Sequence, residues 1–382
     1  MKKIIAVLLA LTFCVACFAA CGGNDATEGT TAAGDETTAA ATDVVYGDKT
    51  FNTIKVGTGG TTGTYYAFAG ASTQAITTGS YTFEVVSTGG SQANIEGIDD
   101  GDYHMATVQN DVMNYAYNGT NGFDAPIRSF SAIACIYPEV CQLVATEGSG
   151  IKSLEDLKGK TVSIGAQGSG VFYNATQILA AAGIDYETDI NATFLSFGDS
   201  ATGLKDGTIH AAFITAGTPT TAITELATAT NVVAIDLGED VIAKLMNDFP
   251  FYTKYEMTSA DYGFITETVN TVAIMATYVV TNEMSEDQAY EITKNLWEVE
   301  DVATCHAKAA QMDINTTVNG IGDVPLHPGA LKYYVEKGII AAEADETTEA
   351  AAEETTEAVA EETTEAVAEE TTEAAAEETT AA

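Results

Sequence analysis

Residues Ile54–Phe68 read IKVGTGGTTGTYYAF, a short apolar run followed by a loop of glycine and threonine and then by an aromatic pair. Glycine lets the backbone adopt conformations closed to other residues and lets a ligand come close, and threonine adds a small hydroxyl. The loop matches neither common nucleotide pattern. Gly63 is followed by Thr64 where a phosphate loop needs lysine, and Thr62 stands where the dinucleotide fingerprint needs its third glycine. The stretch therefore predicts a strand, a ligand-contacting loop and a helix, without a nucleotide.

The same pattern of strand, loop and helix recurs along the chain. Four further segments show it: TFEVVSTGGSQANIEGIDDG (residues 82–101), HMATVQNDVMNYAYNG (104–119), TVSIGAQGSGVFYNATQILAAAG (161–183) and HAAFITAGTPTTAITELAT (210–228). Strands that alternate with helices predict an α/β fold with largely parallel sheets, in which the loops after the strands line a crevice. We expect a ligand in that crevice.

The composition of these loops suits an anion. A helix N-terminus offers unpaired backbone N–H groups and about half a positive charge, so it binds an anion without a basic side chain. Glycine, serine and threonine leave those groups accessible. For any single loop, an ordinary helix cap or tight turn is the competing interpretation. Five such loops in one chain favour a binding site.

The N-terminus has the pattern of a bacterial export signal. Lys2 and Lys3 precede an apolar run over residues 4–20, after which the composition becomes polar. The sequence FAAC at Phe18–Cys21 resembles a lipoprotein processing site, which predicts lipidation of Cys21. An uncleaved membrane anchor is the alternative. Either interpretation places the protein outside the cell membrane, held by its N-terminus.

The C-terminus and the charge balance limit the partners. From about residue 341 the chain repeats EETTEAVA with a period of eight residues and carries 15 of the 55 acidic residues. Such a segment cannot offset its ordering entropy, which predicts a disordered tail, with a helix as the alternative. The formal net charge is −40 and Arg128 is the only arginine, which argues against nucleic acid as a partner.

Neither a disulfide framework nor a metal site is predicted. Cys135, Cys141 and Cys305 stay in the mature chain, an odd number that cannot pair completely. If residues 133–146 form one strand, Cys135 and Cys141 lie about 20 Å apart, too far for a bridge. A hairpin at Pro138 is the alternative. The four histidines are scattered without metal-ligand spacing, so we expect neither a metal nor a cofactor.

Several motifs together resemble the TAXI family of extracytoplasmic solute receptors, which serve tripartite ATP-independent periplasmic (TRAP) transporters. The resemblance rests on VGTGGTTGTYY, VQNDVMNYAYNG, SLEDLKGKTVSIGAQGSG, LKDGTIHAAFITAGTP and HPGALKYYVEKG, and it covers nearly all of residues 44–338. It implies a two-lobed type II periplasmic-binding-protein fold with the ligand in a cleft between the lobes. It also implies a monomeric receptor with a membrane permease as its partner.

The resemblance and the connectivity predict five regions. Strands around residues 133–146 and 271–283 cross between the lobes, with hinges near Tyr137 and Ala276. The regions are the lipoprotein signal with its lipidated cysteine (1–21), a flexible spacer (22–43), lobe 1 (44–139 and 273–340), lobe 2 (140–272) and the acidic repeat tail (341–382).

The candidate ligand-binding residues end the predicted strands or begin the helices after them. They are Thr58, Gly59, Thr64, Tyr65, Ser87, Gln109, Asn110, Gln167, Ser169, Gly170, Tyr173 and Thr215. Their backbone N–H groups and hydroxyls suit a carboxylate, whereas Arg128 lies outside the five loops. Together with the resemblance, they predict a small carboxylate as the solute, an acidic amino acid such as glutamate or a related dicarboxylate.

The predicted function is capture of this solute outside the cell membrane and its delivery to the TRAP permease. A ligand-sensing subunit of a membrane signalling receptor would use the same fold and cleft. An enzyme is the third hypothesis. The sequence GGSQA at residues 89–93 approaches the nucleophile elbow, but Ala93 replaces its last glycine and no triad is evident. We therefore expect no enzymatic activity.

Overall fold

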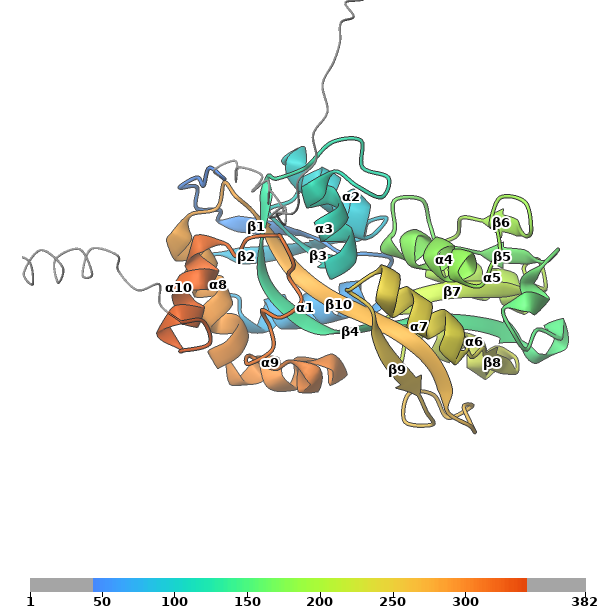
Figure 1. The fold of residues 1–382 in the computed structure, drawn as a ribbon. Coiled ribbons are helices and arrows are strands. Elements are labelled where there is room, and N and C mark those ends of the chain that lie inside the picture. Colours follow the sequence, from blue (N-terminus) through green and yellow to red (C-terminus); the bar gives the residue numbers. More distant parts are fainter. Residues whose placement is uncertain (1–43, 342–382) are drawn as a thin grey trace, which may run out of the picture. The chain divides into compact units, whose positions relative to one another are not determined.

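A computed structural model describes residues 44–341, which form two lobes joined by one mixed β-sheet (Figure 1). The strands hydrogen-bond in the order β2-β1-β3-β10-β4-β7-β5-β6, with β8 also paired to β4 and β9 to β10. They are β1 (Thr53–Gly57), β2 (Thr82–Val86), β3 (Met105–Gln109), β4 (Phe130–Thr146), β5 (Thr161–Ser163), β6 (Asn191–Thr193), β7 (Ala211–Ala216), β8 (Val232–Ala234), β9 (Thr253–Met257) and β10 (Val269–Thr281).

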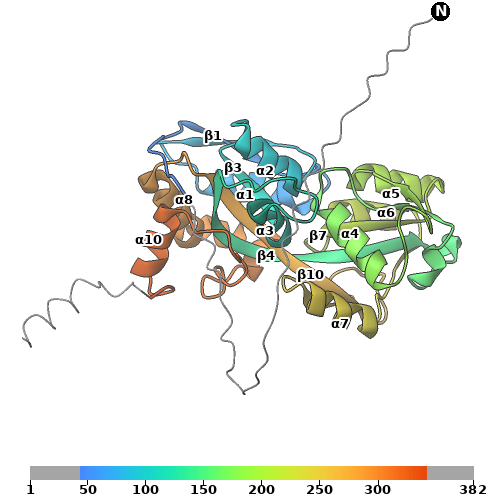
Figure 2. The same ribbon diagram turned by 45° about the horizontal axis from the view of Figure 1, so that its top comes forward.

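Two long strands connect the lobes. β4 reads FSAIACIYPEVCQLVAT, and its nearly continuous burial is typical of a central strand that is covered on both faces. β10 runs antiparallel to β4, and both strands pass from one lobe into the other in Figures 1 and 2. The pairing has two irregularities, one of them directly beside the pair Tyr137–Ala276. The predicted hinge residues Tyr137 and Ala276 therefore face each other where the pairing between β4 and β10 is irregular.

Each lobe repeats one arrangement of strands. In lobe 1, β2, β1 and β3 are parallel, and β10 runs antiparallel beside β3. In lobe 2, β6, β5 and β7 are parallel, and β4 runs antiparallel beside β7. The loops at the carboxyl ends of the parallel strands are the ligand-binding position of open α/β sheets.

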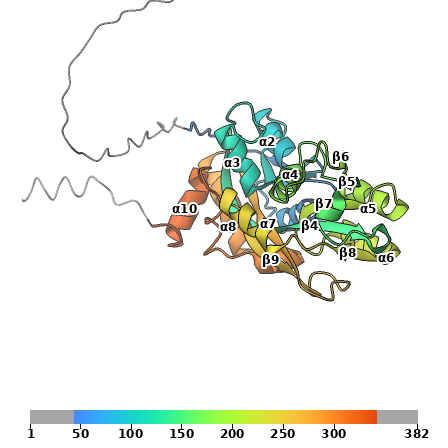
Figure 3. The same ribbon diagram turned by 45° about the vertical axis from the view of Figure 1, so that its right-hand side comes forward.

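The helices follow the strands of each lobe. Lobe 1 holds α1 (Thr64–Ala75), α2 (Ser91–Asp99), α3 (Asn110–Asn118), α8 (Glu286–Glu298), α9 (Glu300–Cys305) and α10 (Pro328–Glu336). Lobe 2 holds α4 (Gly170–Ala181), α5 (Phe197–Asp206), α6 (Thr221–Ala229) and α7 (Glu239–Asp248). Three short 3₁₀ turns span Glu147–Ser149, Glu155–Leu157 and Ala307–Gln311. α8 and α10 pack together at the end of lobe 1 that is remote from β5 and β6 (Figure 3).

Separate hydrophobic cores support the lobes. Phe68 and Met105 are fully buried in a core of lobe 1, and Leu143 and Phe213 are buried in a core of lobe 2. Each lobe therefore has its own interior. Such a construction allows the lobes to move as bodies on the two crossing strands.

The predicted two-lobed α/β fold is confirmed. β4 is one continuous strand, and Cys135, Cys141 and Cys305 are free, so the alternative of a hairpin at Pro138 is wrong. The lobe boundaries between residues 139 and 140 and between residues 272 and 273 stay a prediction.

The predictions for both ends of the chain lie outside the described residues. They are the export signal, the lipidation of Cys21, the spacer and all but the first residue of the acidic tail. Between residues 44 and 341, no helix has the length and the hydropathy that a bilayer-spanning segment needs.

Candidate ligand-binding site

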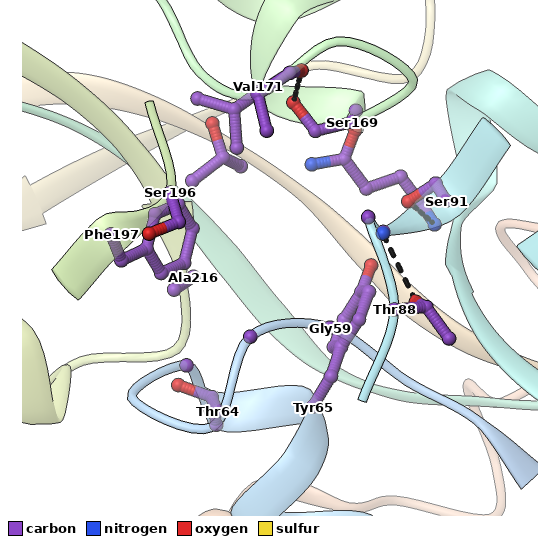
Figure 4. A pocket seen from close by; sticks show the side chains of 18 of the residues that line it. Gly59, Thr64, Tyr65, Thr88, Ser91, Ser169, Val171, Ser196, Phe197 and Ala216 are labelled. Carbon is purple, nitrogen blue, oxygen red and sulfur yellow. Dashed lines mark hydrogen bonds between the residues drawn. The ribbon is translucent and has the colours of Figure 1, made fainter. Parts of the chain in front are cut away.

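A cavity of about 160 Å³ lies between the lobes (Figure 4). Its lining combines helix starts with the ends of strands, and consists of Gly59, Gly60, Gly63, Thr64, Tyr65, Thr88, Gly89, Gly90, Ser91, Gln109, Glu139, Ala166, Ser169, Gly170, Val171, Leu195, Ser196, Phe197, Thr215 and Ala216. A pocket for a drug-sized ligand holds roughly 300 to 1,000 Å³. The cavity therefore suits a small metabolite.

Four helices begin at the cavity. α1 and α2 of lobe 1 start after Gly63 and Gly90, and α4 and α5 of lobe 2 start after Ser169 and Ser196. The first N–H groups of a helix have no acceptor within the helix and carry a partial positive charge. No lysine, arginine or histidine is among the described residues that line the cavity. Its positive potential therefore comes from backbone groups.

The two lobes cap these helices differently. The hydroxyls of Ser169 and Ser196 each accept a hydrogen bond from an N–H group of their own helix. Gly63 and Gly90 have no side chain that can do so. Gly90 also has a φ of +110°, a backbone conformation that favours glycine. The helix starts of lobe 1 therefore keep more of their N–H groups for other acceptors.

Glu139 is the only charged side chain among the described residues that line the cavity, and it is only 2% exposed. It lies on β4 and accepts a hydrogen bond from the Tyr65 hydroxyl. Burial raises the pKa of the Glu139 carboxyl well above its usual range, although the bond from Tyr65 acts in the opposite direction. Burial therefore favours the neutral form of this carboxyl.

Gln109 ends β3 beside the same cavity. Its Nε2 donates to Asn174 Oδ1 at 3.1 Å, whereas its Oε1 is buried and has no hydrogen-bond partner among the described residues. Gln109 pairs with Ala276 of β10. Glu139 pairs with Ile274, two residues away on the same strand, so Gln109 and Glu139 lie on one face of the sheet.

Hydrogen bonds join the lobes around the cavity. The carbonyl oxygen of Gly168 in lobe 2 accepts from the backbone N–H groups of Gln92 at 3.1 Å and Ala93 at 3.2 Å, at the start of α2. Thr64 Oγ1 of lobe 1 donates to the carbonyl oxygen of Gly217 in lobe 2 at 3.0 Å. The described conformation is thus one in which the lobes are in contact.

A buried polar network extends from the cavity between α3 and α4. Asn174 Nδ2 donates to Asp111 Oδ2 at 3.0 Å and to the Tyr252 hydroxyl at 2.9 Å. The Tyr252 hydroxyl donates to Gln177 Oε1 at 2.6 Å, and Gln177 Nε2 donates to the Tyr115 hydroxyl at 3.1 Å. Burial raises the pKa of Asp111 to about 7. The network adds a further contact between the lobes.

A family model described as the NMT1-like family matches residues 56–338, which include every residue that lines the cavity. The chain belongs to the NMT1-like family.

Solved structures similar to this NMT1-like protein include three binding proteins. The alkanesulfonate-binding protein SsuA from Xanthomonas axonopodis pv. citri, bound to MOPS, is 14% identical, with 75% of this chain and 83% of that chain covered and a TM-score of 0.42. A binding protein component of an ABC phosphonate transporter from Pseudomonas aeruginosa is 13% identical, with 83% and 99% covered and a TM-score of 0.44. A mutant of ArgBP from T. maritima is 13% identical, with 68% and 95% covered and a TM-score of 0.44.

The cavity of the NMT1-like protein brings together seven of the twelve predicted binding residues. These are Gly59, Thr64, Tyr65, Gln109, Ser169, Gly170 and Thr215. The other five, Thr58, Ser87, Asn110, Gln167 and Tyr173, do not line it.

Two of these five hold the loops after β1 and β2 together. Thr58 Oγ1 donates to the carbonyl oxygen of Val86 at 2.6 Å, and Ser87 Oγ donates to that of Gly59 at 2.9 Å. Both hydroxyls thus fix the shape of loops that line the cavity.

The remaining three predicted residues point elsewhere. Asn110 Nδ2 donates to the carbonyl oxygen of Gly320 at 3.0 Å, and Gln167 is exposed. The Tyr173 hydroxyl of lobe 2 donates to Gln92 Oε1 of lobe 1 at 2.8 Å. Tyr173 therefore joins the lobes instead of lining the cavity.

Sequence reasoning missed Glu139 and the start of α5 at Leu195–Phe197 of the NMT1-like protein. Glu139 falls within an apolar run, and the available signal was an acidic residue inside an otherwise hydrophobic strand. This segment follows β6, which has only three residues and is too short to show a strand pattern in the sequence. Ser196 and Asp199 at the start of α5 were the signal there, because such a pair is typical of a helix N-terminus.

Arg128 lies away from the cavity, as the sequence predicts. It is exposed, its guanidinium lies over the Tyr117 ring at 5.1 Å, and its Nε donates to the carbonyl oxygen of Tyr117 at 3.3 Å. Within residues 44–341, no group of three His, Cys, Asp or Glu side chains is placed to hold a metal ion.

Proposed function

We propose that this protein is an extracytoplasmic solute-binding receptor that is anchored to the membrane by a lipid on Cys21. It captures a small carboxylate, an acidic amino acid such as glutamate or a related dicarboxylate, and delivers it to a TRAP-type permease. The choice of permease rests on the resemblance of the sequence motifs to TAXI receptors. The anchor rests on the lipoprotein pattern at Phe18–Cys21.

One observation carries the choice of solute. Four helix N-termini from two lobes surround a small cavity that no described basic side chain lines. A carboxylate there receives hydrogen bonds from backbone N–H groups, and the partial positive charge of the helices stabilises it. Because helix starts flank the cavity from both lobes, the arrangement also suits a solute with two carboxylates.

Capture requires that the solute shifts the equilibrium between open and closed lobes. A ligand that contacts helix starts of both lobes binds the closed arrangement more tightly, and only such a difference in affinity shifts the populations. The hydrogen bonds from Thr64 to Gly217 and from α2 to Gly168 already join the lobes in the described conformation. A permease that recognises the closed arrangement would then distinguish loaded from empty receptor.

The competing functions have less support. A sensing subunit would use the same cavity and the same closure, so the membrane partner of the closed form distinguishes it from a transport receptor. For catalysis, the cavity offers Glu139 and the Tyr65 hydroxyl, but no histidine is among its described lining residues. Ser91, the candidate nucleophile, accepts a hydrogen bond from the Gln109 backbone N–H at 3.1 Å, which fits a structural role.

Thermal unfolding of the mature chain tests the solute class. The panel is L-glutamate, L-aspartate, glutarate, succinate, glucose and zinc chloride. A ligand at 100 times its Kd stabilises the folded state by about 2.7 kcal/mol, which raises the Tm of a protein of this size by roughly 4 °C. We expect this shift from at least one carboxylate. A response to glucose or zinc without a response to any carboxylate would contradict the proposal.

Two further measurements test the mechanism with the carboxylate that responds. Arg128→Ala should keep the Kd within about twofold, since substitutions on the surface away from a site have small effects. Loss of binding in this variant would show that the guanidinium, and not the helix N-termini, holds the carboxylate.

Small-angle scattering should show a smaller radius of gyration with the ligand, and an unchanged radius at saturation would contradict ligand-driven closure.

A further inference from the structure

The cavity contains an oxygen acceptor that a carboxylate does not satisfy. Glu139 accepts a hydrogen bond from Tyr65 at Oε2, and its Oε1 accepts none from residues 44–341. The Glu139 side chain lines the cavity and is only 2% exposed. A ligand that satisfies Glu139 Oε1 must donate a hydrogen bond.

The Glu139 carboxyl takes part in none of the ion pairs between described residues. The charge of Lys308 reaches it, but Lys308 Nζ donates to Gln311 Oε1 at 2.9 Å and the residue does not line the cavity. A buried carboxylate without a cation is costly. The position beside Glu139 therefore suits a cationic group of a ligand.

We propose that Glu139 selects a solute with an ammonium group, so that the solute is an amino acid and not an amine-free dicarboxylate. An ammonium has three N–H donors and no acceptor, so it can donate to Glu139 Oε1 and pair with the carboxylate charge. The helix N-termini then hold the carboxylate of the same molecule. This inference rests on the proposed function and narrows its solute class.

An amino acid and an amine-free dicarboxylate should differ in the number of protons that the protein releases when it binds them. Burial raises the pKa of the Glu139 carboxyl, which favours its protonated form. A bound ammonium favours the carboxylate, so the carboxyl and the ammonium form an ion pair and one proton passes to the buffer. An amine-free dicarboxylate needs the protonated carboxyl as a donor and releases no proton from it. The affinity for an amino acid therefore rises with pH, and the affinity for a dicarboxylate falls.

Other titratable groups face Glu139 from the elements packed around it. They are Tyr65 on α1, Asp111 on α3, Tyr137 and Cys141 on β4, and Lys308 on the 3₁₀ turn Ala307–Gln311. The part of their proton release that comes from closure of the lobes is shared by any ligand that closes them in the same way. A comparison of L-glutamate with glutarate, which differ only in the amino group, removes this shared part, and Glu139→Gln separates the contribution of Glu139 from the rest.

Calorimetry of the wild-type mature chain tests the inference. L-Glutamate and glutarate form one pair of probes, L-aspartate and succinate the other, each measured in two buffers of different ionisation enthalpy. In the pair that binds, the amino acid should bind more tightly and release about one proton more than its partner. Equal affinity and equal proton release within the pair would overturn the role of Glu139 and leave the proposed function intact. If none of the four binds, the proposed function fails and the inference fails with it.

Glu139→Gln provides a second test, because it removes the charge and keeps the shape of the side chain. A hydrogen bond between charged groups accounts for about 10- to 150-fold in affinity, so the amino acid should bind that much more weakly while its amine-free partner changes little. Glu225→Gln, on an exposed position of α6, is the matched control and should alter neither affinity. Equal weakening of both probes in a folded Glu139→Gln variant would contradict the inference. If that variant does not fold, the proton count of the wild-type protein decides.

Discussion

The two lobes bring the same element to the cavity, a helix N-terminus, but they complete it differently. In lobe 2, Ser169 and Ser196 cap α4 and α5 with their own hydroxyls, so these helix starts are complete within the lobe. In lobe 1, Gly90 leaves α2 without a side-chain cap. The carbonyl oxygen of Gly168 in lobe 2 accepts from the second and third N–H groups of α2, where a capping side chain would normally bind.

This difference shows which helix starts depend on closure. When the lobes separate, α4 and α5 keep their caps, whereas α2 loses the acceptor that Gly168 provides. Closure therefore completes a helix of lobe 1 with backbone from lobe 2. We infer that substitutions at contacts between the lobes change ligand affinity, whereas substitutions at the caps of lobe 2 change the stability of the fold.

Gly170→Ala should produce the largest effect, because it separates the lobes at the cavity. A Cβ at Gly170 would lie 1.8 Å from Gln109 Oε1, and the three atoms nearest to it all belong to Gln109 of the other lobe. Such overpacking destabilises the closed arrangement by about 1 to 3 kcal/mol, which predicts roughly 5- to 150-fold weaker binding in calorimetry. The melting transition of the ligand-free protein should change little.

Gly70→Ala is the matched control for this substitution. Gly70 lies within α1, and a Cβ there would meet nothing within 4 Å. Alanine should raise the free energy of unfolding by up to about 1 kcal/mol, since glycine is unfavourable inside a helix, and leave the affinity unchanged. Wild-type affinity in Gly170→Ala would show that the lobes close without the observed contact between Gly170 and Gln109.

Thr64→Val tests another contact between the lobes and should have a smaller effect. It removes the hydrogen bond from Thr64 to Gly217, which contributes about 0.5 to 1.5 kcal/mol, and so predicts roughly 2- to 12-fold weaker binding. The lower end of this range is expected, because the Gly217 carbonyl keeps a bond from Thr220. Thr176→Val is the control, since Thr176 Oγ1 bonds only within α4, and its affinity should stay that of the wild type. Equal affinities for both variants would show that the hydrogen bond from Thr64 to Gly217 does not contribute to closure of the lobes.

The cavity-lining residues that could be predicted from the sequence are those whose position depends on local structure. Gly59, Thr64 and Ser169 stand at a strand end or a helix start, and that position alone brings them to the crevice of an α/β sheet. Glu139 could not be predicted in this way, because the direction of its side chain depends on the pairing of β4 with a strand more than 120 residues later in the chain. Asn110 does not line the cavity for the same reason, since its side chain turns to Gly320, a residue far along the chain.

Ser169 offers the most direct test of the difference between the lobes. Its substitution removes the side-chain cap of α4 in lobe 2, so that this helix begins without a capping side chain, as α1 and α2 of lobe 1 do. The Ser169 hydroxyl is already engaged, since it accepts from the Phe172 N–H and donates to the Ala166 carbonyl oxygen at 2.6 Å. Ser169→Ala should therefore lower the free energy of unfolding by about 0.5 to 2 kcal/mol, and Ser169→Gly by only a few tenths. Both variants should bind the solute with a Kd near that of the wild type, because the N–H groups at the start of α4 remain. Chemical denaturation and calorimetry on the pair separate the two effects. A large loss of affinity with unchanged stability would show instead that the hydroxyl contacts the ligand.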